Sequence, residues 1–147
     1  MNVKETLFED MKKAMRDKDL LRKEMLQIVR AAILQVEKDQ KIELDDAGAA
    51  EIIAKEHKKR VENLNDLKDS GREDILEKNR AEILILEEYL PKQLSEQEIT
   101  DIVDAAIRQS GASSARDMGK VMQVIMPQVK GKADGKLVSQ IVRKQLG

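Results

Sequence analysis

Apolar residues recur every three to four positions along most of the chain, a spacing that places them on one face of an α-helix. The first apolar stripe runs from Val3 to Met15 and the second from Leu21 to Val36, with a polar break at Asp17–Asp19 between them. A third stripe runs from Ile53 to Leu67, and a fourth from Leu76 to Leu90. The pattern therefore predicts four helices before Pro91.

Capping signals set the expected boundaries of the later helices. Ser70 followed by Glu73 has the spacing of a capping box, which predicts that the fourth helix starts there. Pro91 disfavours helical geometry at the residue before it and is expected to stop that helix. Ser95 followed by Glu98 predicts a second capping box and the start of a fifth helix.

Three more signals divide the last third of the chain. Gly111 is expected to end the fifth helix, because glycine adopts the left-handed conformation found at helix ends. Ser113 or Ser114 is expected to cap a sixth helix, which Pro127 kinks or ends. Asp134 is expected to cap the last helix. The sixth helix has a stripe predicted to be buried, made of Met118, Val121, Met122, Ile125 and Met126, and Gly119 is expected to let a neighbouring helix approach closely.

These elements predict an all-α fold with no strand. Residues 1–92 are expected to form an N-terminal bundle of long helices. Residues 93–147 are expected to form a compact three-helix C-terminal module. Short connections make successive helices antiparallel neighbours.

Composition narrows the class of protein. With 41% hydrophobic and 37% charged residues, the 147-residue chain is expected to be soluble and globular, and no apolar run is long enough to span a bilayer. No signal peptide is recognisable, so we expect a cytoplasmic protein without a membrane partner. The absence of cysteine excludes disulfides and thiol nucleophiles. One Phe, one Tyr and no Trp offer few stacking surfaces for single-stranded nucleic acid.

The net charge of −1 hides an uneven distribution. From Ser113 to the end of the chain, seven basic residues stand against two acidic ones, so this part carries +5 and the remainder −6. An anionic partner at the basic end is one interpretation, and a solvated helix face is the other. The candidate phosphate-binding residues are Arg116, Lys120, Lys130, Lys132, Lys136, Arg143 and Lys144.

Two long motifs carry a resemblance to a known family. The run EYLPKQLSEQEI (Glu88–Ile99) and the run GASSARDMGKVMQVIMPQVKGKADGKLVSQIVRKQL (Gly111–Leu146) resemble the YqeY family. The second run is also similar to the C-terminal domain of the B subunit of the tRNA-dependent amidotransferase (GatB/YqeY). The YqeY resemblance covers the whole chain, whereas the amidotransferase similarity is clearest over the last third.

The resemblance implies an all-helical two-part fold and, as in the amidotransferase, a tail that reaches tRNA. We therefore expect tRNA or another structured RNA as the partner, and we expect no DNA partner and no cofactor. It does not imply catalysis, because the amidotransferase performs its chemistry in other domains. Any activity would be a carbon–nitrogen ligase activity by family association. Two other hypotheses stay open: a protein-interaction adaptor for an aminoacylation or amidation complex, and an amidotransferase-like accessory protein.

Other candidate features favour structural roles. Gly131-Lys132 is followed by Ala133, so the chain lacks a Walker-type phosphate loop. The glycines of the GKADGK turn either let backbone N–H groups approach a phosphate or simply permit a tight turn. His57 lies on an apolar stripe and is expected to be a half-buried spacer rather than a catalytic base. The adjacent carboxylate pairs Asp45-Asp46 and Glu87-Glu88 are expected on the surface or at caps, and no metal site is expected.

Overall fold

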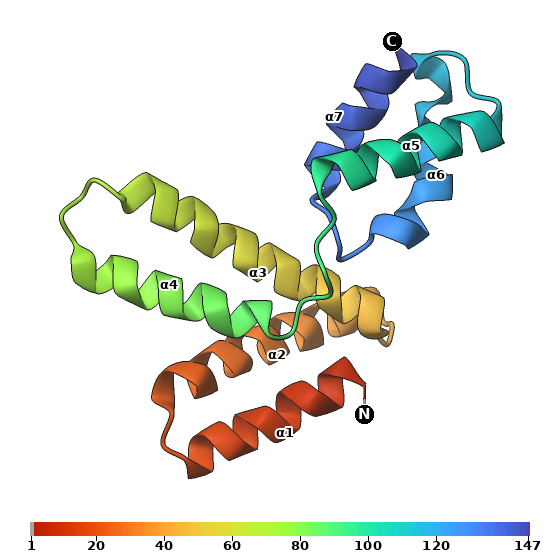
Figure 1. Cartoon of the computed structure of the whole chain (residues 1–147). Helices are drawn as coiled ribbons and strands as arrows, with labels where there is room; N and C mark the ends of the chain where they lie inside the picture. Colours follow the sequence, from red (N-terminus) through yellow and green to blue (C-terminus); the bar gives the residue numbers. More distant parts are fainter. Residues whose placement is uncertain (1) are drawn as a thin grey trace. The chain divides into compact units, whose positions relative to one another are not determined.

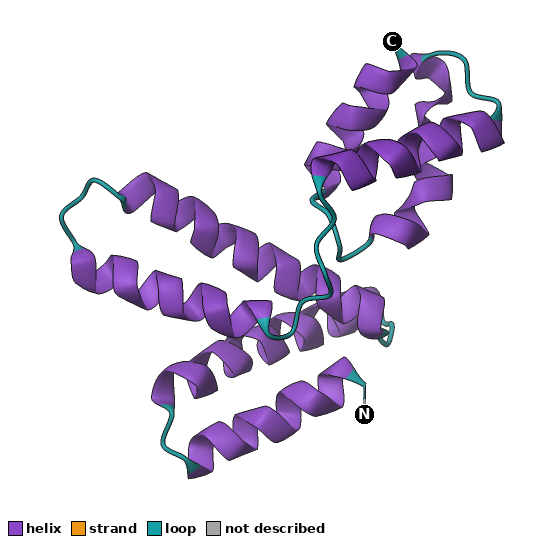
Figure 2. Cartoon of the chain, in the orientation of Figure 1, coloured by secondary structure: helices purple, strands orange, loops and turns teal. Residues whose placement is uncertain are grey.

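The structure, a computed structural model, describes residues 2–147. Over this range the chain consists of helices joined by loops and contains no strand, so the all-α prediction is confirmed (Figure 2). The chain divides into two compact units, the first ending at Leu90 and the second spanning Pro91–Gly147. The boundary expected from the sequence, after residue 92, lies two residues further along the loop of residues 88–95, which joins the fourth and fifth α-helices.

The first unit is built from two helical hairpins (Figure 1). One hairpin pairs α1 (Val3–Arg16) with α2 (Leu20–Gln40), and the other pairs α3 (Asp46–Leu67) with α4 (Glu73–Glu87). Aliphatic side chains from all four helices meet in one core, where burial of each large side chain contributes about 1.5–3 kcal/mol. The fully buried large side chains of this core are Leu7, Met25, Leu26, Val29, Ile53 and Leu86.

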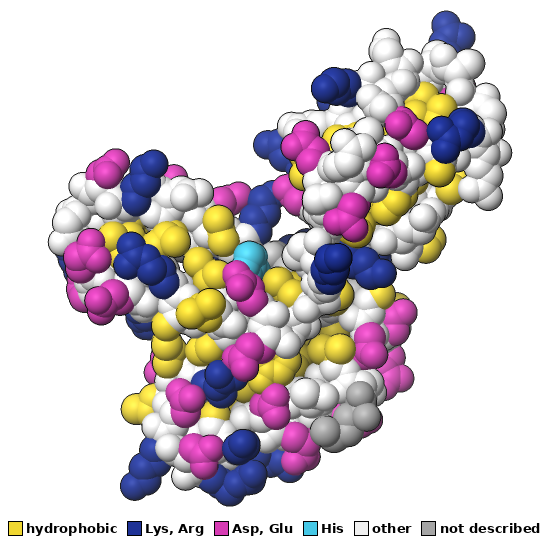
Figure 3. All heavy atoms as spheres, viewed as in Figure 1, with side chains coloured by type: hydrophobic (Ala, Val, Ile, Leu, Met, Phe, Trp, Pro, Cys, Tyr) yellow, Lys and Arg dark blue, Asp and Glu magenta, His cyan; other side chains and the backbone are white. Residues whose placement is uncertain are grey.

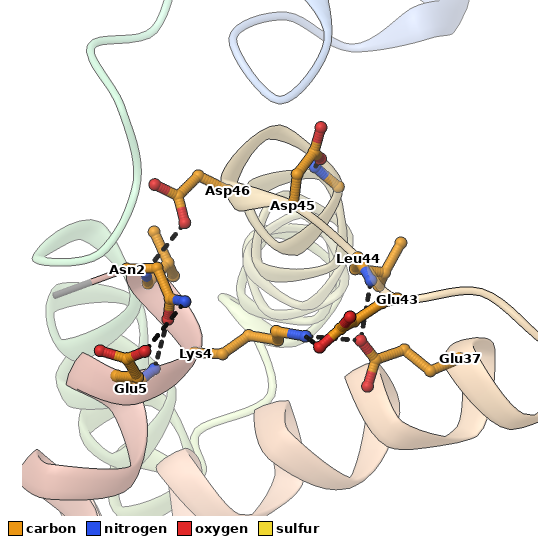
Figure 4. Close-up of polar contacts among 10 residues, drawn as sticks. Asn2, Lys4, Glu5, Glu37, Glu43, Leu44, Asp45 and Asp46 are labelled. Carbon is orange, nitrogen blue, oxygen red and sulfur yellow. Dashed lines mark hydrogen bonds and ion pairs between the residues drawn. The ribbon is translucent and has the colours of Figure 1, made fainter.

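Polar contacts join three helix ends at one corner of the first unit (Figure 4). Lys4 Nζ lies 2.7 Å from Glu37 Oε2, and the same oxygen accepts a 2.8 Å hydrogen bond from the backbone N–H of Leu44. The bond from Lys4, and then the one from Leu44, hold the pKa of Glu37 below its usual range. The backbone N–H of Val3 donates to Asp46 Oδ1. The start of α1, the end of α2 and the start of α3 are therefore tied together.

The start of α4 differs from the prediction. Ser70 forms no capping box, because the helix begins at Glu73 after Arg72, which makes no side-chain capping bond. Gly71 has φ = +76°, a left-handed conformation that cannot belong to the first turn of a helix. Ser70 Oγ instead accepts a hydrogen bond from the N–H of Arg72. At its other end α4 stops at Glu87, three residues before Leu90.

The second unit packs three helices and a short 3₁₀ turn around its own core. The elements are α5 (Glu96–Ser110), η1 (Ala115–Asp117), α6 (Met118–Val129) and α7 (Gly135–Leu146). The core is aliphatic, and its fully buried large side chains are Ile99, Val103, Val121, Ile125, Val138 and Val142.

The ends of α5 and the start of α7 agree with the sequence signals. Ser95 Oγ accepts from the N–H of Glu98, and the Glu98 carboxylate accepts from the N–H of Ser95, so this capping box is confirmed. Gly111 follows the helix with φ = +69°, as predicted. Asp134 caps α7 through a hydrogen bond from the N–H of Lys136.

The start of α6 was predicted incorrectly. Neither serine caps this helix, because η1 precedes it and the Asp117 carboxylate accepts from the backbone N–H of Ser113. A side chain added at Gly119 would meet nothing within 4 Å, so Gly119 is not a point of close helix approach.

The end of α6 and part of its buried face also differ from the prediction. Pro127 lies inside the helix, which continues to Val129, so the alternative that Pro127 ends the helix is wrong. The buried face consists of Val121, Ile125 and Val129, whereas Met126 is 38% exposed. The methionine stripe therefore lies at the edge of the core and not at its centre.

Candidate nucleic-acid interface

All seven basic residues singled out from the sequence are exposed in the second unit. They form two groups. The turn group lies in and just after the loop between α6 and α7 and consists of Lys130, Lys132 and Lys136. The helix-end group lies at and near the start of α6 and in the last turn of α7 and consists of Arg116, Lys120, Arg143 and Lys144.

The geometry of the α6–α7 hairpin separates these two groups. A short loop joins the helices, and they pack against each other, so they run antiparallel (Figure 1). The start of α6 therefore lies near the end of α7, at the opposite end of the hairpin from the loop. A helix of 12 residues such as α7 is about 18 Å long. The seven cations thus mark two ends of one hairpin and do not surround a single turn.

The backbone of the α6–α7 loop is already hydrogen-bonded within the second unit. The N–H groups of Lys132 and Ala133 both donate to the carbonyl of Val129, at 2.8 and 3.1 Å. The N–H of Lys136 donates to Asp134 Oδ1. These three donors are not free to cradle a phosphate, so contacts from this loop to an anion must come chiefly from the lysine side chains. Gly131, which has φ = +76°, serves the tight turn.

The connector before α5, Pro91–Leu94, also forms hydrogen bonds to this loop. Gln93 Nε2 donates to the carbonyl of Gly131 at 3.0 Å, and the N–H of Leu94 donates to the carbonyl of Lys132 at 2.8 Å. Leu94 also packs against the core of the second unit. Two consecutive connector residues therefore donate to the carbonyls of two consecutive loop residues, Gly131 and Lys132.

The charges of the second unit are segregated. The unit contains nine Lys and Arg against six Asp and Glu, while the first unit contains eighteen against twenty-two. Lys120 pairs loosely with Asp117, at 3.9 Å, and within residues 2–147 the other six basic candidates form no ion pair in the structure. Four of the six acidic residues lie on α5: Glu96, Glu98, Asp101 and Asp104. The basic side chains on α6, α7 and their loop are thus available to an anionic partner.

A polar cleft of about 500 Å³ in the first unit was not predicted from the sequence. It lies between α1, the start of α2 and the residues after α4. Tyr89 donates to Asp10 Oδ2 at 2.6 Å, and Arg22 Nη1 lies 2.8 Å from Glu88 Oε2. Arg22 also pairs with Asp19, so one guanidinium bridges two of the acidic residues that line the cleft. Burial, and then the bond to Asp10, raises the pKa of the Tyr89 hydroxyl.

Replacing Tyr89 with phenylalanine is expected to lower the free energy of unfolding by about 1 kcal/mol at neutral pH, since Asp10 loses its donor. The raised pKa means that the folded state keeps this proton more tightly than the unfolded state. The contribution is fully present below about pH 10 and is lost as the pH rises towards the folded pKa. Urea unfolding from pH 7 to 11 should show the difference between wild type and Tyr89→Phe narrowing above pH 10. A constant difference would contradict this.

A family model described as "Yqey-like protein" matches residues 4–146 of the chain. The chain belongs to this YqeY-like family. The resemblance carried by the two sequence motifs is thereby confirmed over nearly the whole length. A relative is the protein named "Altered inheritance of mitochondria protein 41, mitochondrial" from Pyrenophora tritici-repentis (strain Pt-1C-BFP). It is 28% identical over 141 residues, which cover 94% of this chain and 77% of the relative.

The α3–α4 hairpin of this YqeY-like chain buries a charged cluster that sequence reasoning missed. Arg60 Nη1 lies 2.7 Å from Glu56 Oε2, and Arg60 Nε lies 3.7 Å from Glu82 Oε2. The three side chains are only 11–12% exposed. Arg60 Nε is buried without a hydrogen-bond partner in the structure. The guanidinium of Arg60 thus forms ion pairs with two buried carboxylates.

His57, another candidate from the sequence, lies on α3 of the YqeY-like chain. His57 is half-buried, and its Nε2 lies 3.2 Å from Glu87 Oε1 on the neighbouring helix. Residues 2–147 contain no group of three or more His, Asp or Glu side chains placed to hold a metal ion. Within the same range, no helix combines the length and apolar content needed to cross a bilayer.

Proposed function

We propose that this YqeY-like chain is a non-catalytic protein that associates with tRNA or another structured RNA through its second unit. The observation that carries the proposal is the pair of exposed basic groups, six of whose seven members form no ion pair within residues 2–147. Clustered cations of this kind lower the free energy of a nearby polyanion. The resemblance of residues 111–146 to the C-terminal domain of the amidotransferase B subunit, carried by the sequence motif alone, also supports it.

The chemistry of the surface favours recognition of backbone and shape. The second unit contains no aromatic side chain, so successive bases have no ring on which to stack. Lysine and arginine contact phosphates without reading sequence. Binding should therefore tolerate different RNA sequences and weaken steeply as salt is added. A cytoplasmic location belongs to the proposal, although the relative carries a mitochondrial name.

The direct test measures binding of bulk tRNA to wild type and to a variant with Lys130, Lys132 and Lys136 all replaced by glutamate. We expect the variant to bind at least roughly tenfold more weakly at low salt. A matched control replaces the exposed Lys38, Lys68 and Lys78 of the first unit by glutamate, which changes the net charge equally. Equal losses in both variants, or no binding by wild type at low salt, would overturn the proposal.

An adaptor function in an aminoacylation or amidation complex is the second candidate. Large apolar side chains exposed on the first unit favour it, notably Leu20, Leu34 and Leu84, which are 57–65% exposed; Figure 3 shows apolar side chains at the surface of this unit. Such side chains can contact a protein partner. Co-purification of a partner that survives both nuclease treatment and high salt would support the adaptor and count against RNA association.

A further inference from the structure

The side chain of Gln93 forms hydrogen bonds both to its own connector and to the loop that carries Lys130 and Lys132. Its Nε2 donates to two carbonyl oxygens, those of Pro91 and Gly131, each at 3.0 Å. The first acceptor belongs to the connector itself and the second to the α6–α7 loop, 38 positions away from Gln93. One exposed side chain therefore joins the two segments.

This link complements the bonds that the loop makes to its own helix. The N–H groups of Lys132 and Ala133 donate to the carbonyl of Val129 at the end of α6. The carbonyls of Gly131 and Lys132 accept from Gln93 and Leu94. Loop and connector consequently hold each other. Any shift of the loop that moves Lys130 or Lys132 must break or bend these connector bonds.

We propose that Gln93 is a positioning residue that couples the turn group to the connector Pro91–Leu94. This inference rests on the proposed RNA association and adds a consequence to it. The bonds of Gln93 hold Lys130 and Lys132 in the arrangement that meets phosphates, and an RNA bound there holds the connector in place. The coupling acts in both directions, because an effect of one event on a second requires an equal effect of the second on the first.

The test compares wild type with Gln93→Met, which keeps the length of the side chain and removes its donor. We expect bulk tRNA to bind the variant about two- to tenfold more weakly, which corresponds to losing the one hydrogen bond that joins Gln93 to the α6–α7 loop. Gln109→Met is the matched control, since Gln109 is exposed on α5 and its side chain makes no hydrogen bond within residues 2–147. This control should bind tRNA as wild type does.

Amide hydrogen exchange supplies a readout that a purely structural role would not move. In wild type, bound tRNA should slow exchange at the N–H of Leu94, which donates to the Lys132 carbonyl. In Gln93→Met, exchange at Leu94 should be faster in the free protein and should slow less when tRNA binds. The exchange of core amides such as that of Val103 should be alike in both proteins.

The outcomes separate the two proposals. If wild type binds tRNA, but Gln93→Met binds equally well or tRNA leaves Leu94 exchange unchanged, the coupling is wrong and RNA association stands. If wild type binds no tRNA at low salt, RNA association fails and the coupling fails with it. Weaker binding by Gln93→Met, with the expected exchange at Leu94, supports both.

Discussion

Replacing Arg60 with methionine is expected to lower the free energy of unfolding of the first unit by about 3–5 kcal/mol. The reason is that Arg60 forms ion pairs with two carboxylates, those of Glu56 and Glu82. Glu56 and Glu82 are each about nine-tenths buried, and without the guanidinium they would share a space of low polarity with no buried counter-charge. Lys59 can pair with Glu56 only from the surface, because its side chain is 68% exposed. Urea or thermal unfolding at neutral pH measures the loss.

A compensating variant distinguishes buried charge from lost packing. If Glu56 and Glu82 are replaced by methionine together with Arg60, no charge of the cluster remains, and stability should return to near the wild-type value or exceed it. Replacing the exposed Arg72 by methionine serves as the control and should change stability by less than about 0.5 kcal/mol. A loss below about 1 kcal/mol for Arg60→Met would contradict the expected dependence of the two carboxylates on Arg60.

The Arg60 cluster also shows what the sequence could not predict. Glu56 and Arg60 are four residues apart, which in sequence is indistinguishable from an exposed ion pair on a helix surface. Only the packing of α4 against α3 brings in Glu82 and buries all three side chains. The polar cleft is a similar case, since Asp10, Arg22 and Tyr89 come from three separate segments with no shared spacing.

Helix starts that depend on residues close in sequence were predictable only where the backbone conformation agreed with the capping signal. The spacing of serine and glutamate is the same at Ser95 and at Ser70, yet only Ser95 forms a capping box. The difference is Gly71, whose left-handed conformation delays the start of α4. The all-α fold followed from apolar periodicity alone. The separation of the seven basic residues into two groups required knowledge of the antiparallel course of α6 and α7.

Because the basic residues form two separate groups, replacing either group is expected to change the salt dependence of RNA binding. Binding that neutralises phosphates releases counterions, so the logarithm of the affinity falls linearly with the logarithm of salt concentration, by about 0.7–0.9 per phosphate contact. Replacing Lys130, Lys132 and Lys136 by glutamine should therefore flatten the slope by about 2–3 if each lysine contacts a phosphate. Replacing the four residues of the helix-end group by glutamine should flatten it by about 3–4.

Lys136 and Lys144 are eight residues apart on α7, about 12 Å along the helix axis, and Lys130 and Lys132 lie before the helix. An RNA that contacts both groups must therefore lie along the hairpin. Both glutamine variants should then lose slope, and combining them should nearly abolish the salt dependence. Replacing Glu96 by glutamine and Asp101 by asparagine on α5 provides the control. That variant should bind somewhat more tightly, because repulsion of the RNA is reduced. Its salt slope should equal that of wild type, because it removes no phosphate contact. If the helix-end variant keeps the wild-type slope, the RNA contacts only the loop end of the hairpin, and the extended footprint is wrong.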